Sequence, residues 1–177
     1  MMMPRAVAGA FLWAGMAAAG TAQAQGAKPC LPAPEAEALV LSLAPQLIQA
    51  TATACAQHLP PAAHLRRPPA QLTGKYAAED ARAWPLAKQA LKKLTGPETH
   101  DMLDSELAKP MIGSMIAPML AKEIKPADCP AIDRVMTLID PLPARNTAAL
   151  IVTILDLSNR KDKPSAIAIC PATRSPR

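Results

Sequence analysis

The distribution of prolines constrains this fold more than any other feature of the sequence, because there are 20 of them in 177 residues. Proline lacks a backbone N–H and clashes with the preceding helical turn, so proline pairs mark places where regular helix stops. The pairs at 60–61 and 68–69 therefore bracket a linker, and Gly96-Pro97 predicts the end of a helix. Between these marks the apolar residues recur at steps of three and four, which is the helical period.

This pattern predicts five or six short helices. They cover residues 35–58, 85–94, 99–124, 130–140 and 146–158, with one or two further helical turns between 71 and 83. Pro45 lies inside the first pattern without shifting its phase, so we expect a kink there rather than a break. Pro110 and Pro118 are expected to kink or divide the third helix. The stretch 110–121 carries no charge, which predicts that it is the buried central helix.

The two helices nearest the C-terminus have the clearest expected starts, with Asp128 before Pro130 and Asn146 as a second cap. In the last helix we expect Leu150, Ile151, Ile154 and Leu155 to face inward. From about residue 160 the chain is expected to be an extended tail, with Ile167 and Ile169 against the core. No two segments alternate over enough residues to build a sheet, so the sequence predicts a compact all-α domain.

Residues 1–24 have the pattern of a secretory signal peptide. Arg5 is their only charge, an apolar run follows over 6–20, and Ala22-Gln23-Ala24 forms an A-x-A cleavage site. The run is too short and too rich in alanine for a membrane span, which needs roughly 20 strongly apolar residues. We therefore expect residues 25–177 to form a single periplasmic or secreted domain without stable membrane insertion; a leader retained as an anchor is the alternative.

Four cysteines follow this leader, which predicts two disulfides in an exported protein. An antiparallel hairpin of the last two helices would favour Cys129–Cys170, leaving Cys30–Cys55. The second pairing conflicts with a continuous first helix, because residues 35–55 would span about 30 Å, whereas bridged Cα atoms lie within roughly 7 Å. Either Pro45 breaks the helix or the pairing is crossed.

Charge and aromatic content argue against nucleic-acid binding. The net charge is +5, with no basic run longer than two residues. Beyond the leader only Tyr76 and Trp84 are aromatic, whereas nucleic-acid binders combine a basic stripe with stacking aromatics. The core must consequently be built from Leu, Ile, Val, Met and Ala.

Three methionines, Met111, Met115 and Met119, repeat at helical spacing on one face of the expected third helix. Flexible thioethers suit adaptable contacts with a protein partner or an apolar small molecule, so we choose these residues as the candidate binding surface. The simpler interpretation is that they fill a core poor in aromatics. Because thioethers also bind Cu(I), a copper site that includes His100 and Met102 is an alternative.

Catalytic and metal-site motifs are missing from the sequence. It has no G-x-S-x-G, no H-E-x-x-H, no C-x-x-C and no phosphate-binding glycine loop. We therefore predict a non-enzymatic binding protein without metal or cofactor. The alternative is an enzyme whose site combines scattered residues such as His58, His64 and Asp101, although both histidines flank a proline turn and are expected to be exposed loop residues.

Overall fold

The structure is a computed structural model, and it describes residues 30–159 and 167–171. The predicted signal peptide and the first part of the predicted tail lie outside the described residues. The helices of the described part are α1 Ala33–Cys55, α2 Pro69–Leu94, α3 His100–Asp104, α4 Ala108–Lys122, α5 Cys129–Ile139 and α6 Ala144–Asn159. Short 3-10 turns occupy Ala56–His58 (η1), His64–Arg66 (η2), Pro97–Thr99 (η3) and Pro126–Asp128 (η4). The predicted all-α class and two disulfides are confirmed.

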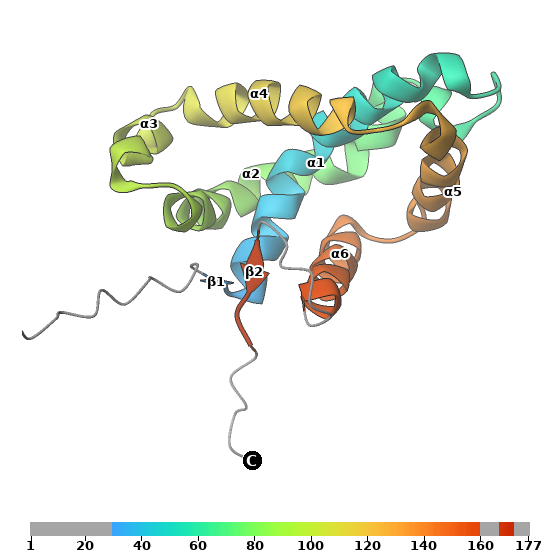
Figure 1. The fold of residues 1–177 in the computed structure, drawn as a ribbon. Coiled ribbons are helices and arrows are strands. Elements are labelled where there is room, and N and C mark those ends of the chain that lie inside the picture. The colour runs from blue at the N-terminus through green and yellow to red at the C-terminus, as the bar shows by residue number, and fades with distance from the viewer. Residues whose placement is uncertain (1–29, 160–166, 172–177) are drawn as a thin grey trace, which may run out of the picture.

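Helix α1 is the centre of the fold, because α2, α4 and α6 all pack against it (Figure 1). It runs through Pro45 without interruption over 23 residues, so the predicted single helix is confirmed and the alternative of a break is not. Among the described residues, only the stretch Ala33–His58 is long and apolar enough to cross a membrane. Its apolar residues face α2, α4 and α6, as expected for a core helix.

Helix α2 is also longer than predicted, because Pro85 lies inside it rather than at the start of a new helix. Tyr76 and Ala87, on either side of Pro85, are both buried in the same core. The proline itself is exposed. Packing against α1 on both sides outweighs the local penalty of about 3 kcal/mol for a proline in a helix.

The boundaries near α3, α5 and α6 differ in detail from the expected ones. The predicted helix 99–124 is divided at residues 105–107, and neither Pro110 nor Pro118 divides it. Asp128 occupies the position before α5 but makes no side-chain capping bond. Helix α6 begins two residues before Asn146, which therefore lies in its first turn rather than capping it.

The prediction that the central helix is 110–121 is wrong, because α4 lies on the outside of α1 (Figure 1). Its buried residues are Ala108, Ile112, Gly113 and Ala117, so a mainly small-residue side faces α1. Helix α6 also buries its smaller residues, which are Ala144, Ala148 and Val152. Leu150 and Ile154 are exposed, contrary to expectation. Small side chains allow close helix approach, and the larger apolar residues are left outside.

The preferred disulfide pairing is also wrong. Cys30 is bonded to Cys170 and Cys55 to Cys129, with Cα atoms 4.9 and 5.4 Å apart. The physical reason is the uninterrupted α1, which holds Cys30 and Cys55 at its opposite ends and so excludes a bridge between them. All four cysteines are used.

The two ends of the described chain meet in a minimal parallel strand pair. Strands β1 (Cys30–Leu31) and β2 (Ala168–Ile169) pair in register, and the Cys170 amide donates a 2.8 Å hydrogen bond to the Leu31 carbonyl. Ile167 and Ile169 pack on the core, which confirms their predicted position. The strand pair itself was not predicted, because two residues are too few to show an alternation.

Candidate functional site

The methionine face of α4, formed by Met111, Met115 and Met119, is open to solvent. These side chains are 44%, 63% and 65% exposed, which excludes the interpretation that they fill the core. Leu107 and Leu120 add exposed apolar surface at the two ends of the helix. Contiguous exposed apolar surface is unusual on a monomeric protein and marks contact sites more often than a scattered residue does.

The chemistry of this face is uniform along its length. No charged residue occurs between Pro110 and Ala121, and Ser114 on the same outer side binds its own helix through the Met111 carbonyl at 2.9 Å. Lys109, at the start of α4, is paired with Asp80 of α2 at 2.7 Å. The methionine face therefore presents thioethers and methyl groups without a charge that would fix the position of a polar ligand.

The shape of the methionine face is that of an outer helix surface. The two pockets described below are lined by other residues, and neither includes a methionine of α4. Small molecules are usually bound in concave sites that cover most of their surface. The geometry consequently suits an extended partner surface better than a small ligand.

The copper alternative required His100 to converge with the methionine sulfurs. The structure instead places His100 at the start of α3, where Nε2 lies 3.2 Å from the Lys92 carbonyl of α2. Met102 is exposed on the same short helix. Among the described residues no group of three His, Cys, Asp or Glu side chains is placed to hold a metal ion.

The scattered residues of the enzyme alternative are not brought together. His58 and His64 follow the C-terminal end of α1. Asp101 follows α2, whose C-terminal end is tied to the start of α1 by the ion pair Lys93–Glu35 at 2.5 Å. The histidines and Asp101 thus lie toward opposite ends of a helix about 35 Å long.

The prediction that His64 is an exposed loop residue is wrong, because it is only 5% exposed. His58 is exposed, as predicted. Its Nδ1 atom is buried without a hydrogen-bond partner in the described part of the chain. No carboxylate of the described residues pairs with either histidine, so the hydrogen-bonded acid–base pair that the enzyme alternative requires is not formed there.

Two carboxylates, Glu79 and Asp104, form ion pairs between helices. Glu79 accepts a 2.7 Å bond from Arg145 of α6, and Asp104 lies 2.7 Å from Lys92 and 3.2 Å from Lys88 of α2. These two lysines hold the pKa of Asp104 below its usual value, mainly through hydrogen bonds. Each pair ties one helix to another.

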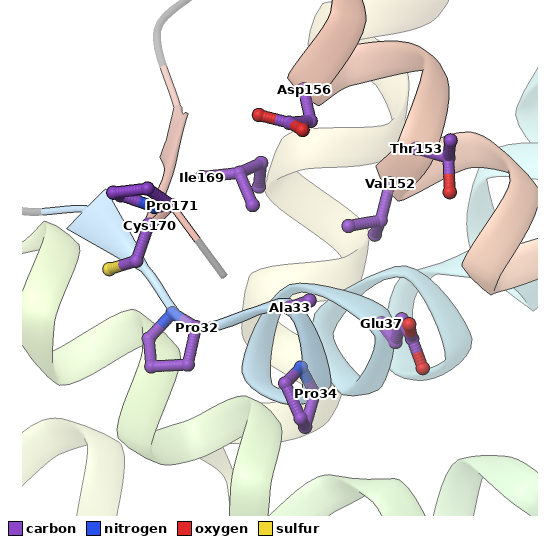
Figure 2. Close-up of a pocket in the computed structure, with 10 residues that line it drawn as sticks. All are labelled: Pro32, Ala33, Pro34, Glu37, Val152, Thr153, Asp156, Ile169, Cys170 and Pro171. Atoms are coloured by element: carbon purple, nitrogen blue, oxygen red, sulfur yellow. The ribbon is translucent and has the colours of Figure 1, made fainter. Parts of the chain in front are cut away.

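A pocket of about 540 Å³ lies beside the disulfide that joins the chain ends (Figure 2). The start of α1, the middle of α6 and the β2 segment form its walls, and Figure 2 shows Glu37 and Asp156 on two of its sides. The Thr153 hydroxyl donates to the Ala149 carbonyl of its own helix at 2.8 Å. Among the described residues, the lining includes no histidine or lysine.

Sequence reasoning identified the methionines but placed them on a helix that was expected to be buried at the centre of the fold. The signal that could have placed them outside is the adjacent set of small residues Ala108, Gly113 and Ala117, which marks the side that faces another helix. Comparison with protein-family models, curated proteins and solved structures finds no match for this chain.

Proposed function

We propose that this is an exported binding protein whose methionine face contacts an apolar surface of a protein partner. The observation that carries the proposal is the exposure of Met111, Met115 and Met119 on an uncharged outer helix. A protein partner is favoured over a small molecule because the face is the outer surface of a helix, whereas small molecules are usually bound in concave sites. Methionine suits this role, since its flexible side chain adapts to more than one partner shape.

We propose the periplasm or another extracellular compartment as the site of action. The leader pattern of residues 1–24 supports export. The engagement of all four cysteines in disulfides is in keeping with an oxidising compartment, where such bonds persist. In this proposal the chain after cleavage carries no membrane anchor.

Photo-crosslinking from a single position tests the proposal. A photoreactive amino acid at Met115 should cross-link one identified protein in the native host. The same amino acid at Ala131, which is exposed on α5, is the matched control and should not. The purified partner should then bind the wild-type protein directly.

The affinity of a triple variant, Met111→Gln with Met115→Gln and Met119→Gln, measures the contribution of the methionine face to binding. Since each lost apolar contact is worth about 1 kcal/mol, we expect affinity for the partner to fall roughly 100-fold. The melting temperature should stay within a few degrees, because these side chains lie outside the core. Equal cross-linking at both positions, unchanged affinity of the triple variant, or binding to lipid vesicles in place of a protein would each refute the proposal.

A further inference from the structure

A half-open cavity of about 120 Å³ lies beside α5, between this helix and α1, α2 and α6. Ala44 and Ile48 of α1, Tyr76 of α2, Met136 and Ile139 of α5, and Ile151 of α6 contribute to its wall. None of these residues belongs to the methionine face of α4. The cavity is therefore independent of the surface proposed above.

The wall of this cavity is almost entirely carbon. Its two hydroxyl groups belong to Tyr76 and Thr147, and the Thr147 hydroxyl donates to the Pro143 carbonyl at 3.3 Å. Neither hydroxyl is among the buried polar atoms that lack a partner. A water molecule needs two to four polar partners, so this cavity offers water little and favours an apolar occupant.

The attachment of α5 explains why the cavity is not closed by packing. Cys129 is the only fully buried residue of α5, and its bond to Cys55 fixes the start of the helix. At the other end, the Lys75 ammonium donates to the carbonyls of Ile139, Asp140 and Leu142 at 2.9, 2.9 and 3.0 Å. Ties at both ends hold the helix in place and prevent the collapse that would otherwise fill such a space.

A third tie lies between these two. The Leu65 amide, in the η2 turn, donates to the Asp133 carboxylate at 2.7 Å. Helix α5 is thus positioned mainly by covalent and polar links, while its apolar residues Met136 and Ile139 face the cavity. The space is preformed, and a ligand entering it needs no rearrangement of the links that hold the helix.

We infer that the cavity under α5 is a binding site for one small apolar group, either a single aromatic ring or a short alkyl chain. Its volume of about 120 Å³ is similar to that of an engineered apolar cavity in another protein, about 150 Å³, which stays dry and binds benzene. A charged group is disfavoured because the wall is almost entirely carbon and contains no charged side chain to compensate for lost hydration.

Benzene is the probe for this site, and methyl-labelled methionine provides the signals. Titration of the disulfide-bonded protein should shift the Met136 methyl resonance saturably, with no saturable shift at Met115 or Met119. Phenol has nearly the same shape but must bury a hydroxyl without a free partner, so we expect it to bind at least tenfold more weakly.

Substitutions locate the binding. Ala44→Leu places a larger side chain in the cavity and should abolish the Met136 shift, whereas Ala54→Leu, at an exposed position of the same helix, should leave it unchanged. If Ala44→Leu does not fold, Ile139→Ala gives the converse test, because the larger cavity should admit p-xylene, which the wild-type cavity is too small to hold. The absence of a saturable Met136 shift, or a shift that persists in folded Ala44→Leu, would overturn the assignment.

Discussion

Gly113 of α4 faces Gln46 of α1 so closely that a Cβ atom added at position 113 would lie 2.9 Å from the Gln46 Cγ. This contact sets the approach of α4 to the central helix. It is in keeping with the outward position of the α4 methionines, since a Cβ at this crossing fits only if the Gln46 side chain moves.

The close approach predicts that Gly113→Val destabilises the protein by about 1–3 kcal/mol, because either Gln46 or the whole of α4 must move. Chemical denaturation of the purified protein measures the difference. Gly74→Ala is the matched control: position 74 lies within α2 with nothing within 4 Å of the added atom. It should stabilise the fold by about 0.5–1 kcal/mol through helix propensity. Equal stability of wild type and Gly113→Val would contradict the close packing.

Lys75 caps the C-terminal end of α5 through three carbonyls. Lys75→Met keeps the aliphatic stem and removes the ammonium, and we expect it to cost about 1–3 kcal/mol of stability. Hydrogen exchange should become faster at the last turn of α5 and remain unchanged in α4. Lys125→Met, at an exposed position, is the control and should alter neither quantity. If both variants behave alike, the cap is not a stabilising feature.

Tyr76 is the only tyrosine of the chain, so its ionisation can be followed by ultraviolet absorbance without overlap. Burial raises the pKa of its phenol above the ordinary value of 10.0, an effect only partly opposed by the neighbouring Thr147 hydroxyl. Between pH 10.0 and this raised pKa, the unfolded chain has lost the proton while the folded one retains it. Stability due to Tyr76 should therefore fall as the pH rises through this window.

The variant Tyr76→Phe should lack this contribution, giving a shallower alkaline loss of stability than the wild type, by at most about 1.4 kcal/mol per pH unit. Burial lowers the pKa of the neighbouring Lys75. The effect of Lys75 on the pH dependence of stability therefore has the opposite sign to that of Tyr76, but it is present in both proteins. A tyrosine that titrates at its ordinary pKa in the folded protein would refute the prediction.

The exposure of the methionine face predicts an order of oxidation. Under dilute peroxide, Met115 and Met119 should form sulfoxides several-fold faster than Met136, which is half-buried and packs against the core. Peptide mass mapping at short times gives the rates for each site. Oxidation of Met136 first would contradict the outward orientation of α4.

The helical period and the prolines were sufficient to predict the fold class, the single helix through Pro45 and the contact of Ile169 with the core. They could not predict that α2 continues past Pro85, because the stabilising contacts come from α1, which is distant in sequence. Local signals also suggested an antiparallel hairpin and hence Cys129–Cys170. The length of the unbroken α1 excludes Cys30–Cys55. The observed choice between the two remaining pairings follows from the strand pair that brings Cys30 beside Cys170.

The methionine face shows a further limit. Its periodicity was visible, but periodicity alone does not tell which of two neighbouring apolar stripes faces inward. In α4 the inward-facing side is the one that carries Gly113 and Ala117, because these small residues allow close packing against α1. The cavity under α5 could not be predicted at all, because residues from four helices form its wall.

The two disulfides are nested, since the loop closed by Cys55 and Cys129 lies wholly within the one closed by Cys30 and Cys170. A protease that cuts one peptide bond anywhere between residues 30 and 170 therefore leaves both fragments covalently joined. Between residues 55 and 129 the same cut falls inside both loops. Nicked molecules would migrate as one species in gel electrophoresis until their disulfides are reduced. Their helices would stay associated even where proteases are abundant.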